Sequence, residues 1–167
     1  GKAAGIILKV NSLSDASLID KLYAAGAAGV KIEMIVRGIF CAEIDRKKFK
    51  QPVKAISIVD EYLEHSRVMI FHNQGKEKVY ISSADWMVRN LNHRVEAAVP
   101  ITDPIIKQEL IDIIHIQLRD NVKARILNSE LANNYVPFVG KKKIRSQIET
   151  YHYLFRKNNT TSEASSN

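Results

Sequence analysis

The chain has 167 residues, of which 46% are hydrophobic and 26% charged, so it can bury the core of one domain and is not disordered as a whole. Its 25 lysines and arginines exceed its 18 acidic residues, which favours phosphate, nucleic acid or an anionic membrane surface as partner without choosing among them. The single cysteine, Cys41, excludes an internal disulfide framework and a multi-cysteine zinc site, and no apolar run approaches the roughly 18 residues of a membrane-spanning helix.

The first third of the chain alternates strand and helix. The apolar run Gly5–Val10 predicts a strand, and the apolar positions that follow recur at helical spacing. Ser14 or Asp15 is the expected N-cap of that helix, and Gly29 its C-terminal cap. Residues 30–36 then alternate with period two, as in a strand. This strand–helix–strand unit predicts two parallel, neighbouring strands.

The rest of the chain predicts more strands and two long helices. Strands are expected at residues 53–59, 67–71, 78–82 and 94–99, with a hairpin turn joining the middle two. Asp103 before Pro104 predicts the start of one helix, and a second helix is expected over 146–155. We therefore expect a mixed, mostly parallel α/β sheet flanked by helices.

Two features suggest how the domain is bounded. The first predicted strand begins almost at the first residue, which suggests a domain cut from a longer protein. Residues 158–167 are rich in asparagine, serine and threonine, so we predict a disordered tail there. The domain is accordingly expected over residues 1–157.

Phosphate binding by this chain would depend on side chains. The seven glycines form neither a Walker-type loop nor a dinucleotide-binding turn, and no HExxH zinc motif is present. Arg37 directly follows a predicted parallel strand, at the sheet edge where open α/β sheets bind ligands. A guanidinium there suits bidentate contacts to phosphate, and the alternative interpretation is a solvated arginine that begins a loop.

A second candidate is His65, which precedes a predicted strand. His65 and Arg67, followed by a hairpin and the Ser83-Ala84-Asp85 turn, resemble the second half-site of the phospholipase D superfamily, with its His-x-Lys and Gly-Ser-x-Asn motifs. An imidazole can attack phosphorus or protonate a leaving oxygen, and a nearby cation neutralises phosphoryl charge. The chain departs from that pattern at Arg67, which replaces the lysine, and it lacks the acidic residue expected a few positions later.

The closest resemblance is to the bacterial polyphosphate kinase family. It covers residues 9–153, and the stretch Ser83-Ala84-Asp85-Trp86-Met87 is its most specific part. The family's Val-Arg-Gly motif falls on Arg37, and its Glu-His-x-Arg motif falls on His65. Further similar stretches lie at 9–15, 35–38, 57–59, 62–67, 80–91, 94–96 and 122–125.

The resemblance implies a fold, a reaction and a set of partners. Enzymes of this family transfer the γ-phosphate of ATP reversibly to the end of inorganic polyphosphate, with Mg²⁺. Their chain ends in two phospholipase-D-like domains, and this sequence is similar to the second. Arg37 and His65 would bind ATP phosphates, His65 also in a supporting catalytic role, while the phosphorylated histidine and the Mg²⁺ ligands belong to other parts of the enzyme.

The same resemblance implies where the protein works and with what. The expected partners are ATP, ADP, polyphosphate, the remaining domains of the same chain and further copies in a homo-oligomer, with no nucleic acid and no membrane span. The expected location is the cytoplasm, with peripheral attachment to the inner membrane as the alternative. The fragment alone is expected to be inactive.

Two other functions stay open at this stage. One is a phospholipase-D-type phosphodiesterase half-site that dimerises to complete an active site. The other is a non-catalytic module that binds polyanions, suggested by six Lys/Arg against one Glu in residues 141–157. A solvated helix face explains that segment equally well.

We expect Trp86 and Met87 to pack in the core. The histidines at 72, 93, 115 and 152 do not have the spacing of metal ligands.

Overall fold

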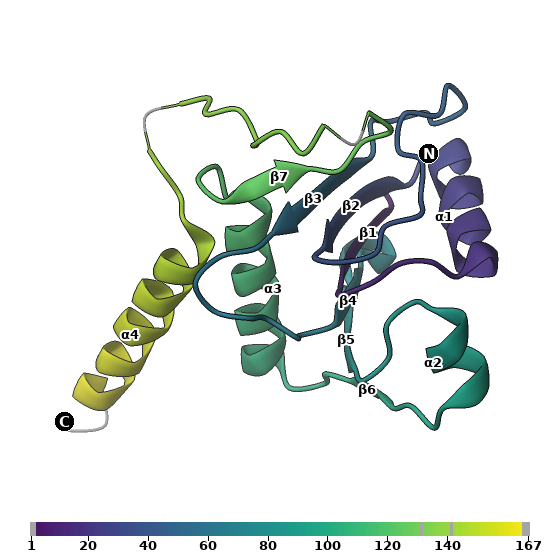
Figure 1. The fold of residues 1–167 in the computed structure, drawn as a ribbon. Coiled ribbons are helices and arrows are strands. Elements are labelled where there is room, and N and C mark those ends of the chain that lie inside the picture. Colours follow the sequence, from purple (N-terminus) through teal and green to yellow (C-terminus); the bar gives the residue numbers. More distant parts are fainter. Residues whose placement is uncertain (1–2, 131, 141, 165–167) are drawn as a thin grey trace.

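The computed structural model describes residues 3–130, 132–140 and 142–164. In this part of the chain one sheet runs in the order β6-β5-β4-β1-β2-β3-β7 (Figure 1). Its strands are β1 (Gly5–Val10), β2 (Lys31–Val36), β3 (Lys54–Ile58), β4 (Val68–Phe71), β5 (Lys78–Ser82), β6 (Ala98–Pro100) and β7 (Ala124–Ile126). The α-helices are α1 (Ala16–Ala28), α2 (Val88–His93), α3 (Pro104–Leu118) and α4 (Ser146–Ala164).

The predicted strand–helix–strand unit at the start of the chain is confirmed. Asp15 is the N-cap of α1, because its carboxylate accepts a hydrogen bond from the backbone N–H of Leu18 at 2.9 Å. Gly29 ends the helix with φ of 100°, a left-handed conformation that glycine adopts without strain. Strands β1 and β2 then pair in parallel.

The mixed α/β class is also confirmed, but the expected predominance of parallel pairing is corrected. Only the β1–β2 and β2–β3 ladders of the described sheet are parallel, and the other four are antiparallel. A parallel pair needs a long crossover, usually a helix. The segment 59–67 between β3 and β4 contains no helix, and β4 and β5 form the predicted hairpin around Asn73–Gly75.

Several boundaries differ from the predictions. The sixth strand lies at Ala98–Pro100 rather than 94–99, and α2 and β7 were not predicted. Helix α4 runs beyond 155 to Ala164, so it extends into the segment expected to be a disordered tail, and residues 165–167 lie outside the described part. Once a helix has begun, each added residue forms one more backbone hydrogen bond and restricts the backbone of one residue only. Extending α4 beyond residue 155 is therefore favourable.

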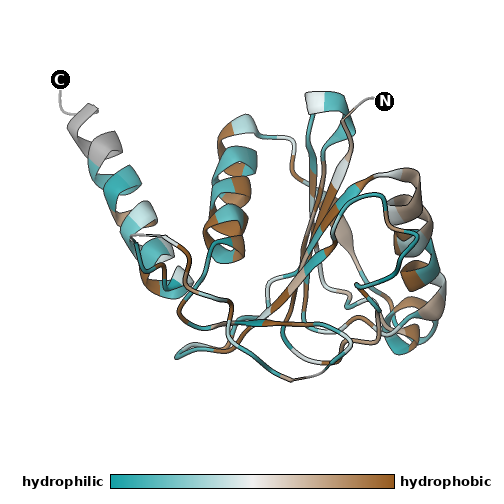
Figure 2. Ribbon diagram, turned by 90° about the horizontal axis from the view of Figure 1, so that it is seen from above, coloured by the Kyte–Doolittle hydropathy of each residue, from teal (hydrophilic) through white to brown (hydrophobic). Residues whose placement is uncertain are grey.

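The sheet separates two apolar layers. Figure 2 shows α1 against one face of the sheet and α3 against the other, with α4 outside α3. On the α1 side the core includes Leu8 and Leu13, and the partly buried Trp86 packs against this core, in agreement with the packing role expected for it. On the other side Ile114 and Leu118 of α3 pack with buried residues of the strands, namely Ile35, Ile56, Ile58, Val68 and Ile70.

Helix α4 is fixed to α3 mainly by polar contacts. The Tyr153 hydroxyl donates to Asp112 at 2.8 Å, and the Lys157 ammonium lies 2.6 Å from a carboxylate oxygen of Glu109. None of the described helices combines the length and the apolar character that crossing a bilayer requires.

Candidate functional site

The two residues selected from the sequence lie at one edge of the sheet. Arg37 directly follows β2, at the carboxyl end of the parallel strands. His65 lies just before β4, which runs antiparallel to β1 with Val68 opposite Lys9. The start of β4 and the end of β1 therefore lie at the same end of the sheet, and Arg37 and His65 both lie at that end. That both side chains reach one phosphate chain stays a prediction.

Arg37 is half-buried, and its guanidinium is not fully paired. Its Nε is buried and has no hydrogen-bond partner within the described part of the chain. Its carbonyl accepts a hydrogen bond from the Ser57 hydroxyl at 3.2 Å, which fixes the backbone where β2 ends. A donor that is buried without an acceptor is uncommon in folded proteins, so Arg37 is suited to a ligand that brings its own oxygen atoms.

The residue after Arg37 brings the ends of β1 and β2 into close contact. The backbone N–H of Gly38 donates to the carbonyl of Asn11 at 2.7 Å. A Cβ atom on Gly38 would lie 3.0 Å from that oxygen and 3.3 Å from the Ser12 hydroxyl. Glycine thus allows the two strand ends to approach beside the candidate site.

His65 is exposed at the end of an anchored segment. The preceding residue, Glu64, accepts hydrogen bonds from the Lys9 ammonium at 2.5 Å and from the Gln117 amide at 2.9 Å. Lys9 also donates to the Gln117 side-chain oxygen at 2.8 Å. This triangle joins β1, α3 and the 59–67 segment, so it fixes the backbone next to His65 while the imidazole remains accessible.

Lys9 is an unusual member of this triangle because it is only 5% exposed. Burial lowers the pKa of its ammonium, the Glu64 carboxylate opposes that effect, and the positive charge of Arg37 adds to the lowering. Because the Glu64 carboxylate lies 2.5 Å from the Lys9 ammonium, this buried pair adds little net charge to the site.

The same segment is anchored at its beginning by the start of α4. The Arg145 guanidinium holds Asp60 through two contacts of 2.8 Å, and these hydrogen bonds lower the pKa of the Asp60 carboxyl. The Gln147 side chain accepts from the backbone N–H of Tyr62 at 3.0 Å and donates to its carbonyl at 2.8 Å. Figure 1 shows the segment passing from β3 beside α3 to β4.

Three cations of the basic segment 141–157 form ion pairs within the fold. Arg145 binds Asp60, Lys142 lies 3.1 Å from Glu149, and Lys157 pairs with Glu109 on α3. Residue 141 lies outside the described residues. These pairings favour the structural interpretation of the segment over a free polyanion-binding stripe.

Arg67 has a different role from the cation of the phospholipase D pattern. Its Nε and Nη2 donate to the two carboxylate oxygens of Asp85 at 3.0 and 3.1 Å, and its Nη1 donates to the His65 carbonyl at 3.1 Å. Asp85 also accepts from the backbone N–H groups of Asn11 at 2.7 Å and Ser12 at 3.1 Å. Arg67 and Asp85 thus join the two halves of the site, a link that the sequence motif did not reveal.

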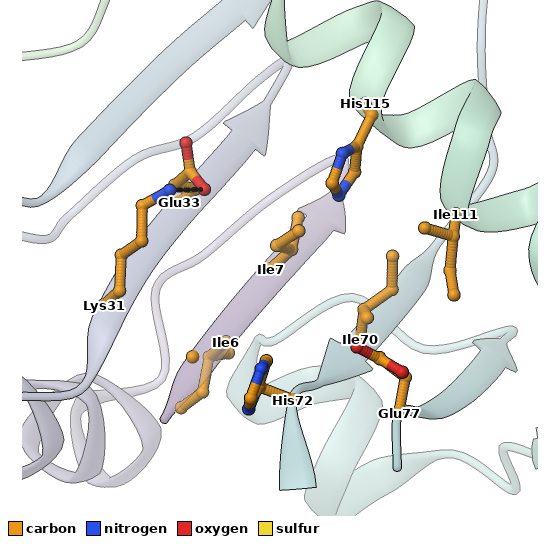
Figure 3. A pocket seen from close by; sticks show the side chains of 10 residues that line it. Ile6, Ile7, Lys31, Glu33, Ile70, His72, Glu77, Ile111 and His115 are labelled. Carbon is orange, nitrogen blue, oxygen red and sulfur yellow. Dashed lines mark ion pairs between the residues drawn. The ribbon is translucent and has the colours of Figure 1, made fainter. Parts of the chain in front are cut away.

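A separate pocket of about 210 Å³ lies away from this site (Figure 3). It lies at the opposite end of β1, over Ile6 and Ile7, and His72 and His115 line it. Neither Arg37 nor His65 contributes to its lining. Among the described residues no group of three or more histidine, cysteine or acidic side chains could hold a metal ion.

Comparison with known proteins identifies close relatives. Residues 1–147 match the family described as Polyphosphate kinase C-terminal domain 2. A polyphosphate kinase of Vibrio parahaemolyticus is 51% identical over 154 residues, and that of Escherichia coli K12 is 48% identical over the same length. Each alignment covers 92% of this chain but 22% of the relative, so the chain spans about a fifth of the length of these relatives.

Solved structures agree with the sequence relatives. A polyphosphate kinase from Porphyromonas gingivalis is 48% identical and has a TM-score of 0.92, over 96% of this chain and 24% of that one. NucT from Helicobacter pylori is 13% identical and has a TM-score of 0.52, over 66% of this chain and 76% of that one, which is a likeness of fold alone.

Proposed function

Because this chain belongs to the polyphosphate kinase family, we propose that it forms the second C-terminal domain of an enzyme that transfers the γ-phosphate of ATP reversibly to the end of inorganic polyphosphate. Residues 1–157 supply phosphate-binding side chains, and the histidine that becomes phosphorylated lies in a preceding domain. The observation that supports this proposal is that an incompletely paired Arg37 and an exposed His65 lie at the same end of the sheet.

The chemistry asked of these residues is positioning and charge neutralisation, which dominate phosphoryl transfer. Arg37 clamps phosphate oxygens through charge-assisted hydrogen bonds. His65 donates a proton or a hydrogen bond to the phosphoryl group during transfer. Arg67 and Glu64 hold the backbone on either side of His65 and do not contact the substrate.

The proposed reaction uses Mg²⁺, but the described residues do not provide a cluster that fits it. We therefore place the Mg²⁺ ligands in other domains and derive no step of this chain through the ion. ATP, ADP and polyphosphate are the proposed small-molecule partners. The other domains and further copies of the enzyme complete the assembly, in the cytoplasm or at the surface of the inner membrane.

The structure weighs against both alternative functions. A phospholipase-D-type half-site needs a cation free to meet phosphate, whereas Arg67 is paired with Asp85 through two contacts. A polyanion-binding module would use the basic segment, whereas Arg145, Lys142 and Lys157 are paired with carboxylates.

The isolated 167-residue chain is expected to make no polyphosphate from ATP and Mg²⁺, because the proposed nucleophile lies in another domain. The check is a polyphosphate assay on the purified chain, with the full-length enzyme carrying this sequence as the positive control. Robust synthesis by the isolated chain would show that the phosphorylated residue is located here.

Replacing Arg37 by alanine in the full-length enzyme tests the proposed site directly. The change removes a charge-assisted contact worth roughly 1.5–3 kcal/mol, so catalytic efficiency should fall by about 10- to 100-fold. Much of the loss should appear as a higher KM, because the contact also holds ATP in the ground state. Steady-state kinetics in both directions measure this effect.

Arg89→Ala is the matched control, because Arg89 is an exposed arginine on α2. Its variant should keep the wild-type kinetic constants. If the Arg37 and Arg89 variants have equal kinetic constants, Arg37 does not bind the substrate phosphates.

A further inference from the structure

A second buried donor lies at the same sheet edge as Arg37. The Nδ2 of Asn11 is buried and has no hydrogen-bond partner within the described residues, as is the case for Arg37 Nε. Asn11 as a whole is only 7% exposed. Buried polar groups are nearly always satisfied in folded proteins, so two unpartnered donors at one edge point to an acceptor supplied from outside the chain.

The strand register places these two residues at neighbouring strand ends. In the parallel β1–β2 ladder the last pair is Val10 and Val36, and Asn11 and Arg37 are the residues that directly follow them. The regular ladder ends at this pair, but the two strand ends stay in contact beyond it, because the Gly38 N–H donates to the Asn11 carbonyl at 2.7 Å. Asn11 and the Arg37–Gly38 segment therefore lie together at the carboxyl ends of β1 and β2.

The local fold holds Asn11 without using its side chain. Its N–H donates to Asp85 at 2.7 Å, and its carbonyl accepts from Gly38 at 2.7 Å. Both backbone groups are therefore satisfied, and the backbone is fixed by β2 and by the Asp85–Arg67 pair. The side-chain amide is a pre-positioned donor, which loses little conformational freedom when a ligand binds.

We propose that Asn11 is a further phosphate-binding residue, whose Nδ2 donates together with Arg37 Nε to oxygen atoms of a bound phosphoryl group. The proposal rests on the proposed function and adds a neutral donor to the cationic one. The substrate class is the same, an ATP or polyphosphate phosphoryl group. Phosphate oxygens accept several hydrogen bonds at once, so they can satisfy both donors.

The test uses the full-length enzyme carrying this sequence and tripolyphosphate as the binding probe. Asn11→Ala removes an unpartnered donor, so the Tm without ligand should stay the same or rise. The dissociation constant for tripolyphosphate should increase about tenfold, the effect of one lost hydrogen bond to a charged acceptor. Asn11→Asp, which places a carboxylate against phosphate, should weaken binding more than Asn11→Ala.

Asn92→Ala is the matched control, because Asn92 is an exposed asparagine on α2. Its variant should bind tripolyphosphate like the wild type. An Asn11→Ala protein that binds normally would overturn the proposal, and so would one that has a clearly lower Tm without ligand, since that marks a structural residue.

The design also separates this proposal from the proposed function. If Arg37→Ala weakens tripolyphosphate binding and Asn11→Ala does not, the role of Asn11 alone is overturned. If the wild type neither binds tripolyphosphate nor makes polyphosphate, both proposals are overturned. A higher KM for ATP in Asn11→Ala, with a smaller change in kcat, supports the binding role.

Discussion

Alanine at position 65 is expected to lower the turnover of the full-length enzyme by about 10²- to 10⁴-fold, the range of general acid–base contributions. His65 is exposed at the sheet edge, and the groups around it hold its backbone rather than its imidazole. The proposed role acts while phosphate is being transferred, so the loss should appear chiefly in kcat and less in KM. Steady-state kinetics in both reaction directions provide the measurement.

A glutamine at the same position separates two roles of the imidazole. His65→Gln can keep a hydrogen bond to phosphate but cannot transfer a proton. If it retains much more turnover than His65→Ala, His65 acts as a phosphate ligand, and if the two variants are equally slow, it acts as a proton donor. The control is His93→Ala, because His93 is exposed at the end of α2. Near-normal turnover in both His65 variants would reduce that residue to a structural one.

The parts of the fold that follow from local signals were predictable from the sequence. The helix α1 has both its caps in the sequence, Asp15 and Gly29, and its flanking strands are apolar. Asp103 before Pro104 likewise marks the start of α3, where the Asp103 carboxylate accepts from two backbone N–H groups. Such features act within a few residues, so spacing along the chain is enough to detect them.

The missed elements are those whose stability comes from distant partners. Strand β7 has three residues, too few to show a period, and it exists because Ala124–Ile126 pairs with β3. Helix α2 is short, polar and without a side-chain cap. The direction of each strand also depends on its partners, which explains why the sheet contains more antiparallel pairing than the sequence predicted.

The candidate site likewise combines residues that short sequence motifs reveal with contacts that depend on residues far away along the chain. Arg37 and His65 were found because each belongs to a short motif beside a predicted strand. The triangle around Glu64 was not found, since its Lys9 and Gln117 lie 55 and 53 residues away along the chain. Asn11 was part of a recognised stretch, but only burial and the β1–β2 register separate it from an ordinary loop residue.

The ion pair between Arg67 and Asp85 should dominate the stability of this edge of the sheet. Asp85→Ala is expected to lower the free energy of unfolding by about 3 kcal/mol, near the lower end for a broken buried ion pair. The lower end applies because the Arg67 side chain is 21% exposed and can partly reach water. The variant also leaves the N–H groups of Asn11 and Ser12 without their acceptor. Chemical denaturation of the purified chain at pH 7 measures the change.

The variant Asp85→Asn tests the same ion pair through the pH dependence of the free energy of unfolding. Burial raises the pKa of Asp85, but the hydrogen bonds from Arg67, Asn11 and Ser12 outweigh it, so the folded pKa lies below its ordinary value. The stability due to the charged carboxylate is therefore complete above pH ~4, the ordinary value for aspartate, and is lost as pH falls through the folded pKa.

Asp85→Asn lacks this charge at every pH, so its difference from the wild type in the free energy of unfolding should shrink as the pH falls below about 4. Asp20→Asn, at an exposed position on α1, is the control and should match the wild type throughout. A wild-type advantage over Asp85→Asn that stays constant into strong acid would contradict the role of the charge. In that case the shape of the residue, rather than its ionisation, would hold the ends of β1 and β4 together.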